Sequence, residues 1–162
     1  ISMKEAASVT IIPDVFLSDD DKILINKFEE LQYFTQIKEI PDSCFCSCPH
    51  LKSIILPKGV KKIGLNAFSG CLSLTEITVP EGVTHIGSRA FNCCYSLERV
   101  LLQKGVTYIG DSAFHLCGSL KTINLPDGLI SIGVGAFGSC TSLECINLPN
   151  GLTYIGSYAF SE

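Results

Sequence analysis

Residues 74–96 read LTEITVPEGVTHIGSRAFNCCYS, and this arrangement of apolar residues returns every 23 positions along the chain. The segment Ile86-Gly-x-x-Ala-Phe91-x-x-Cys94 has counterparts before and after it, all in the same phase. Their first isoleucines follow one another at this constant interval without a slip: Ile40, Ile63, Ile86, Ile109, Ile132 and Ile155. A fixed period of this length indicates a solenoid, in which each repeat forms one turn.

The other half of the repeat predicts a β-strand. Leu74, Ile77 and Val79 precede Pro80, and the alternation around the last two apolar residues is the pattern of a half-buried strand. The same pattern returns in each repeat, up to residues 143–148. Proline lacks the N–H that a sheet needs, so it ends the strand. The glycines expected to form the tight turn after it are Gly59, Gly82, Gly105, Gly128 and Gly151.

A second apolar pair in each repeat, such as Val83-x-x-Ile86, predicts a short strand on another flank. Turns of this kind bury their apolar residues only when they are stacked. In register, strands lie about 4.8 Å apart, so the stack forms a parallel sheet along one side. No single repeat can cover its own Leu, Ile and Phe side chains, whereas stacking makes the core continuous.

The composition excludes several classes of protein. The chain has 162 residues, 46% hydrophobic and 17% charged, which fits one folded domain and not a disordered chain. No apolar run approaches the ~18 residues of a membrane span. The net charge of −4 and the pI near 5.3 argue against nucleic acid as a partner.

The unit Leu-x-x-Ile-x-Leu-Pro-x-Gly-Val-x-x-Ile-Gly-x-x-Ala-Phe-x-x-Cys resembles the leucine-rich repeat of the BspA-like family, over about residues 37–160. The resemblance implies a β-rich, right-handed solenoid with a parallel sheet on one face. Short second strands and 3₁₀ segments around Ala-Phe-x-x-Cys are expected on the other. It also implies a surface protein of a host-associated bacterium or protozoan parasite, which adheres to host matrix proteins, other microbes or epithelium.

Both ends of the chain depart from the regular repeat. Residues 1–27 are interpreted as a degenerate N-terminal capping repeat with a short helix near Met3–Ser8, and residues 28–162 as the solenoid. Counting back one repeat from Leu51 reaches Phe28, which favours a strand over residues 28–33; a short helix capped by Asn26 is the alternative. The C-terminus shows no polar capping repeat, so either the parent protein continues or the open end packs on a partner, end to end.

The cysteines predict a structural column and not a metal site. Five share one repeat position, where reduced, buried thiols are expected: Cys48, Cys71, Cys94, Cys117 and Cys140. The segment Cys44-x-Cys46-x-Cys48-Pro-His50 resembles a zinc motif, but the repeat turns Cys44 and Cys48 inward and leaves two ligands. Asp19-Asp20-Asp21 lacks the spacing of a calcium loop and is interpreted as a solvated turn. We therefore expect no metal and no cofactor.

The outward positions of the strand give the candidate ligand-binding face. The third and fifth residues of Leu-x-x-Ile-x-Leu point away from the core, and the candidates at these positions are Glu76, Thr78, Arg99, Leu101, Thr122, Asn124 and Asn147. Glu76 and Arg99 are expected to form a cross-strand pair. No histidine falls into a catalytic pairing with Ser, Cys or Asp, so an enzyme is not predicted.

Two functions are consistent with this face. The first is a non-catalytic module, extracellular or on the cell surface, for adhesion to a protein or glycan ligand such as a host matrix protein. The alternative is an intracellular scaffold or regulatory adaptor. The odd count of nine cysteines, which are expected to be reduced, favours this alternative.

Overall fold

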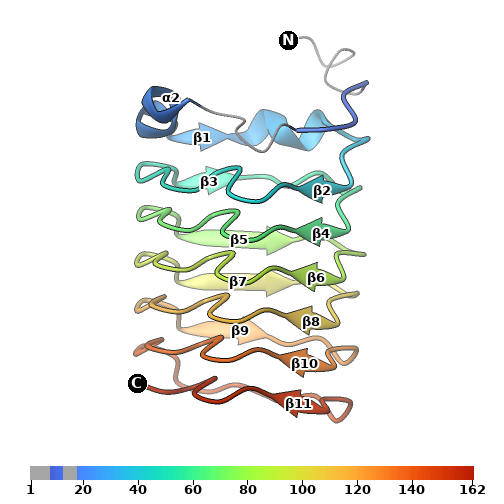
Figure 1. Cartoon of the computed structure of the whole chain (residues 1–162), viewed down its shortest axis with the longest axis vertical. Helices are drawn as coiled ribbons and strands as arrows, with labels where there is room; N and C mark the ends of the chain where they lie inside the picture. The colour runs from blue at the N-terminus through green and yellow to red at the C-terminus, as the bar shows by residue number, and fades with distance from the viewer. Residues whose placement is uncertain (1–7, 13–17) are drawn as a thin grey trace.

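The computed structural model describes residues 8–12 and 18–162 as a parallel β-solenoid of stacked turns. Figure 1 shows the turns following one another in a single column from the N-terminal to the C-terminal end. The helix predicted near Met3–Ser8 falls, apart from Ser8, outside the described residues.

Most turns carry a short strand on one flank, and these strands form a six-stranded parallel sheet. We call it the short-strand sheet; its order is β11-β10-β8-β6-β4-β2. Its members are β2 (Glu39–Ile40), β4 (Lys62–Ile63), β6 (His85–Ile86), β8 (Tyr108–Ile109), β10 (Ser131–Ile132) and β11 (Tyr154–Ile155). The second apolar pair of each repeat thus forms the expected second strand.

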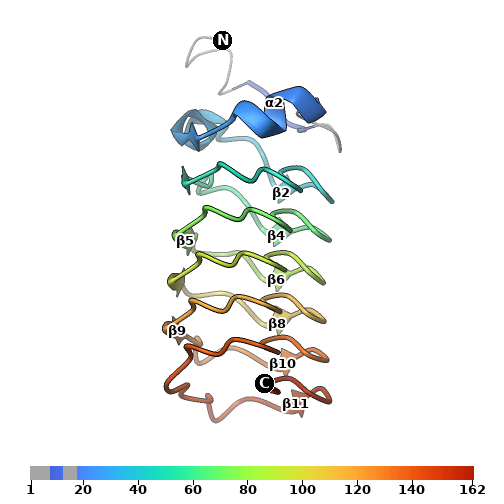
Figure 2. The ribbon, with the colours of Figure 1, turned by 90° about the vertical axis from the view of Figure 1, so that its left-hand side faces the viewer.

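Longer strands form a second parallel sheet on another flank, which we call the long-strand sheet. It contains β5 (Glu76–Val79), β7 (Arg99–Leu102) and β9 (Thr122–Asn124). A separate parallel pair, β1 (Lys27–Phe28) and β3 (Ser53–Ile54), precedes it in the stack. Figure 2 shows β5 and β9 along one edge of the column and the strands β2 to β10 along another. Within the two larger sheets, strands of neighbouring turns pair one repeat of 23 residues apart, as Glu76 does with Arg99.

A ladder of phenylalanines fills the interior. The rings of successive turns are stacked with centroids 5.2–5.4 Å apart and planes within 9° of parallel. The ladder consists of Phe45, Phe68, Phe91, Phe114, Phe137 and Phe160. Each stacked aromatic pair contributes about 0.5–1.5 kcal/mol beyond the burial of its area. The ladder therefore links every turn to the next through the core.

Two kinds of backbone position shape each turn. Of the five glycines expected in the tight turn, Gly82 and Gly105 have positive φ angles (85° and 125°), whereas the other three do not. Left-handed residues instead recur at two other places per repeat, for example Arg89 (φ 55°) and Cys93 (φ 58°). From β4 onward, a glycine follows the isoleucine of each short strand, and close approach of the backbone requires it: a Cβ at Gly110 would lie 2.5 Å from the Ser88 nitrogen.

The N-terminal turns differ from the prediction. Phe28 pairs with Ile54, an offset of 26, whereas Glu39 pairs with Lys62 at the regular 23. The segment between β1 and β2 is therefore three residues longer than the segment between β3 and β4. The 3₁₀ helix η1 (Glu29–Tyr33) accommodates these extra residues. The strand predicted over residues 28–33 is thus wrong beyond Phe28. The alternative of a short helix is confirmed for residues 29–33 as a 3₁₀ helix, but its N-cap is Phe28 and not Asn26. Leu31 and Phe34 are buried against the first turn.

Two further segments depart from the prediction. The acidic segment predicted as a solvated turn begins the helix α2 (Asp19–Leu24), whose N-cap Ser18 accepts a hydrogen bond from the Asp21 N–H at 3.2 Å. The strand predicted over residues 143–148 does not form. There Leu148 is 46% exposed, although its equivalent Leu102 in β7 is 2% exposed, so the last repeat lacks the packing that holds the long strands.

Candidate binding face

The candidate residues of the long-strand sheet form two columns that run along the solenoid. Glu76, Arg99 and Thr122 occupy one register position on β5, β7 and β9. Thr78, Leu101 and Asn124 occupy the second position further along the same strands. All six side chains are exposed, because the intervening residues of each strand point into the core.

Two hollows lie on this face, and together they include all seven candidates. The first, about 470 Å³, contains Glu76 and Thr78 and extends to Glu29 in η1. The second, about 460 Å³, contains the other five candidates: Arg99, Leu101, Thr122, Asn124 and Asn147. Asn147 belongs to the segment without a strand, but it still reaches the second hollow.

The amide of Asn124 is engaged with the protein itself. The Leu102 N–H donates to Asn124 Oδ1 at 3.1 Å, and Asn124 Nδ2 donates to the Leu102 carbonyl at 2.8 Å. The side chain thus imitates the next residue of β9, whose strand ends at this residue. Asn124 therefore shapes the wall of the second hollow, and its amide is occupied.

The charges on this face are arranged differently from the expected cross-strand pair. Glu76 lies opposite Arg99, yet no ion pair within 4.0 Å joins them. The neighbouring Glu98 instead accepts a hydrogen bond from Lys121 Nζ at 2.7 Å, and this contact holds the pKa of Glu98 below its ordinary value. Among the described residues, Arg99 has no ion-pair partner, so its guanidinium is available to an acidic or hydrogen-bonding ligand group.

Several residues of the first hollow were not identified from the sequence. Glu29 was missed because the three-residue insertion before β2 shifts its register. Gln103 occupies the position that is proline in the other repeats, and this exception in the sequence could have indicated a separate role for it. Its side-chain oxygen accepts a hydrogen bond from the Glu81 N–H at 2.9 Å. Ser53 also lines this hollow, and its third, outward position in the repeat does follow from the strand pattern; its hydroxyl oxygen is shielded from solvent without a hydrogen-bond partner.

The cysteine column lies in the interior, away from the candidate face. Four of its members are buried and Cys140 is half-buried. Four of the thiols donate to the phenylalanine carbonyl 26 positions earlier, as Cys94 does to Phe68 at 3.3 Å. Burial raises the pKa of Cys94 to about 12 and that of Cys140 to about 11. The thiols of Cys94 and Cys140 are therefore protonated and unreactive near neutral pH.

The described residues contain neither a disulfide nor a group of three or more potential metal ligands. Cys44 and Cys48 of the zinc-like motif are buried, whereas Cys46 is half-buried and His50 is exposed. The motif therefore points its members in different directions, as the repeat requires.

The sheets and their register define a leucine-rich-repeat protein built as a parallel β-solenoid. Residues 38–162 match six copies of the BspA type leucine rich repeat region, and the chain belongs to this family. Proteins of this family are typically non-catalytic. A search of the curated proteins finds no match.

Solved structures of bacterial proteins share the fold. A leucine rich cell surface protein from Faecalibacterium prausnitzii is 37% identical over 68% of this chain, with a TM-score of 0.64. The T. pallidum leucine rich repeat protein is 30% identical over 80%, with a TM-score of 0.69. A leucine-rich repeat protein from Bacteroides ovatus is 36% identical over 77%, with a TM-score of 0.59. The chain spans 29%, 65% and 38% of these relatives, respectively.

Of these three proteins, the one from F. prausnitzii is described as a cell surface protein. Within the described residues, no helix has the length and apolar character needed to cross a bilayer.

Proposed function

We propose that this protein is a binding module of the cell surface, which recognises a protein or glycan ligand through the long-strand sheet. The observation that supports this most directly is the pair of adjacent hollows, of about 460 Å³ and 470 Å³, on one exposed face. Solenoids present extended surfaces of this kind to their partners. A host matrix protein is the ligand class that we favour.

The chemistry of the face supports recognition and gives no reason to expect turnover. Leu101 and Ile55 are 47% and 43% exposed and offer apolar contact. Arg99 and Glu76 supply charges of opposite sign, and neither forms an ion pair with another described residue. Interfaces combine apolar anchors with charged groups that select the partner. Both kinds of group lie within reach of one ligand, because they share the same face of adjacent turns.

An intracellular scaffold that uses the same face is the second candidate. The nine cysteines favour it: none forms a disulfide in the described residues, and Cys145 is exposed. Oxidising compartments favour disulfides, so free thiols fit a reducing one. The two candidates differ in location and not in the chemistry of the face.

The location is tested by labelling intact source cells with a membrane-impermeant amine reagent. Labelling in unbroken cells is the expected result, because exposed lysines such as Lys52 and Lys61 would be reachable. Protection until lysis would reject the surface module and leave the scaffold.

Recognition through this face is tested with Arg99→Glu. We expect the variant to weaken binding to immobilised fibronectin, fibrinogen, laminin or mucin, whichever wild type binds, by about tenfold or more, since one unpaired charge is reversed. Arg89→Glu is the matched control, because Arg89 is exposed but lies outside both hollows. Unchanged binding by Arg99→Glu, or an equal loss in both variants, would place recognition elsewhere.

A further inference from the structure

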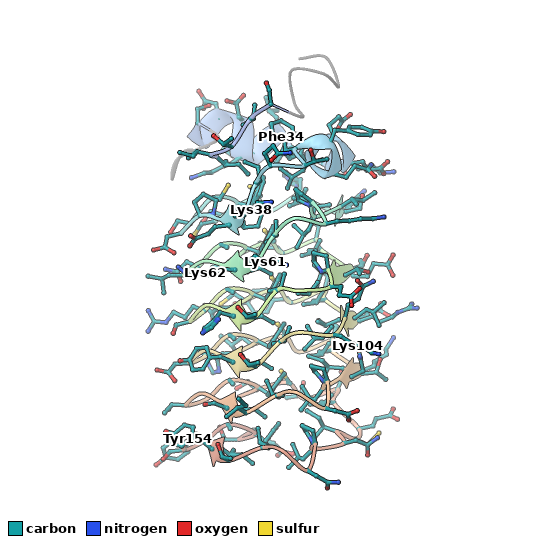
Figure 3. All side chains as sticks on the ribbon, turned by 90° about the vertical axis from the view of Figure 1, so that its right-hand side faces the viewer. Phe34, Lys38, Lys61, Lys62, Lys104 and Tyr154 are labelled. Carbon is teal, nitrogen blue, oxygen red and sulfur yellow. The ribbon has the colours of Figure 1, made fainter. Side chains whose placement is uncertain are left out.

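A second surface gathers lysines on another side of the molecule. We define the basic strip as Lys38, Lys58, Lys61 and Lys104, which lie around the tight turns that lead into the short-strand sheet. Figure 3 shows Lys38, Lys61 and Lys104 on the side of the solenoid that faces the viewer. All four side chains are exposed, and none of the four lines either hollow except Lys58, which borders the first.

Two ammonium groups of the strip lie in equivalent places on adjacent turns. The Lys61 N–H donates to the Lys38 carbonyl at 2.7 Å, which fixes the two residues side by side. Lys38 Nζ lies 3.3 Å from the position that a Cβ of Gly59 would occupy, and Lys61 Nζ likewise lies against Gly82. Because stacked turns repeat at about 4.8 Å, the two charges are separated by roughly one turn.

Lys104 extends the strip to the turn after Gly82. The Gly82 N–H donates to the Lys104 carbonyl at 2.9 Å, so the backbone of Lys104 lies beside the glycine that Lys61 Nζ covers. Lys58 immediately precedes Gly59, the glycine that Lys38 covers. Gly59 thus has Lys38 Nζ and the adjoining residue Lys58 beside it, and Gly82 has Lys61 Nζ and the backbone of Lys104.

The charge of the strip is largely uncompensated. Within the described part of the chain, none of its four lysines forms an ion pair, whereas the adjacent Lys62 is paired with Glu39 at 2.6 Å. Glu81 is the acidic residue at the equivalent position between Lys58 and Lys104, one turn from each of them. Asp127 occupies the same position one turn after Lys104. The strip is therefore basic although the whole chain carries −4. Like charges on neighbouring strands cost stability, and a bound anion removes that cost.

The neighbouring side chains favour a hydrophilic polymer. The column that begins with Lys38 and Lys61 continues with Thr84 and Thr107, whose hydroxyls donate to backbone carbonyls at 3.2 and 3.1 Å. Thr84 Oγ1 also lies 2.8 Å from His85 Nδ1, so the Thr107 oxygen is the one that remains an acceptor for a sugar hydroxyl. The next residue of this column, Ile130, is 50% exposed, so the polar stretch ends at Thr107. Between Lys38 and Thr107 the column offers no large apolar or aromatic side chain, which protein partners use as anchors and which single-stranded nucleic acids use for stacking.

We propose that the basic strip binds an acidic polysaccharide laid along the solenoid axis, with its sulfate or carboxylate groups on Lys38, Lys61 and their neighbours. This site is distinct from the long-strand sheet and does not depend on the function proposed for that face.

Dextran sulfate is the probe, with binding measured by biolayer interferometry on the full chain. We expect Lys38→Ala/Lys61→Ala to bind about tenfold more weakly than wild type. Glu81→Gln should bind several-fold more tightly, because it removes the opposing charge. Raising the salt concentration from low to about physiological strength and beyond should weaken the binding of dextran sulfate by wild type. It should also reduce the difference in affinity between wild type and the variants.

The matched control is Lys27→Ala/Lys52→Ala, which removes two exposed lysines from the side of β1 and β3. We expect it to bind as wild type does. An equal loss in the control, no loss in Lys38→Ala/Lys61→Ala, or equal binding of uncharged dextran would overturn the site. Tighter binding of polyglutamate or single-stranded DNA of matched charge would overturn the ligand class. Far-UV circular dichroism checks that each variant is folded.

Discussion

At the scale of single residues, the cysteine column shows how a repeat position acquires a second role. The sequence predicts that small apolar residues at this position are buried, and in the structure these side chains lie in the interior. The structure adds that the thiol donates to the phenylalanine carbonyl of the preceding turn, at 3.1–3.3 Å in four cases. A thiol therefore fills a small volume and also satisfies a buried carbonyl, which alanine in its place would leave without this donor.

The buried thiols predict a dependence of stability on alkaline pH. Cys94 has a pKa of about 12 in the folded protein because it is buried, whereas an unfolded cysteine titrates near 8.5. The folded state thus retains a proton that the unfolded state loses, so this stabilisation is complete below about pH 8.5 and is lost as the pH rises toward 12. From pH 8 to pH 10, Cys94 should account for about 2 kcal/mol of lost unfolding free energy.

The measurement is urea denaturation of wild type and Cys94→Ala at pH 8, 9 and 10. The variant is expected to be less stable at pH 8 but to lose less stability with rising pH. Cys140 serves as an internal control, because burial raises its pKa without a contribution from Cys94, whereas Cys94 contributes to the raised pKa of Cys71 and Cys117. Parallel curves would contradict the assignment of the effect to Cys94.

At the scale of elements, each turn is set by two types of glycine that the sequence alone does not distinguish. The glycine that follows isoleucine lies against the backbone of the preceding turn. A Cβ at Gly110 would lie 2.5 Å from the Ser88 nitrogen and 2.7 Å from the Gly87 carbonyl carbon. At Gly128, in the tight turn, a Cβ would meet nothing within 4 Å and φ is not positive.

The two glycines therefore predict opposite outcomes for the same substitution. Gly110→Ala should destabilise the protein by about 3 kcal/mol or more, because backbone must move apart from backbone. Gly128→Ala should be neutral or stabilising by up to about 1 kcal/mol, since alanine reduces the entropy of the unfolded chain. Thermal and urea unfolding of both variants measures the difference. A comparable effect in the two would contradict the close-approach argument.

The regular elements were predictable from the sequence, whereas the irregular ones were not. Period-2 alternation and the constant repeat spacing located β5, β7 and the short-strand sheet. The N-terminal register failed because three inserted residues are absorbed by η1, and a period cannot show where an insertion is accommodated. The strand over residues 143–148 failed because strand formation depends on packing between turns as well as on local pattern.

At the scale of the whole molecule, the candidate face was predictable as a set of positions but not as a shape. Alternation identified which residues point outward, and all seven candidates line the two hollows. Hollows depend on neighbouring segments, so Glu29 and Gln103 could not be assigned from the strand pattern. The occupied amide of Asn124 likewise depends on where β9 ends.

Stacking also makes stability depend on position along the solenoid. In a one-dimensional array, a turn is stabilised by its neighbours on both sides. Phe91 is fully buried between Phe68 and Phe114, with both ring centroids 5.2 Å away. Phe160 is 39% exposed and stacks on Phe137 at 5.4 Å. The same side chain therefore has two partners in the ladder at one position and one at the other.

This difference predicts how far each phenylalanine supports the fold. Phe91→Ala should cost about 3–5 kcal/mol, the range for a large side chain removed from a packed core. Phe160→Ala should cost less than half as much, because part of its surface is already in water. Hydrogen exchange then separates the two effects by location: Phe91→Ala should speed exchange in the turns on both sides, whereas Phe160→Ala should speed it in the last turn alone. A loss below about 1 kcal/mol for Phe91→Ala, or equal losses for the two variants, would contradict the view that the ladder couples the turns.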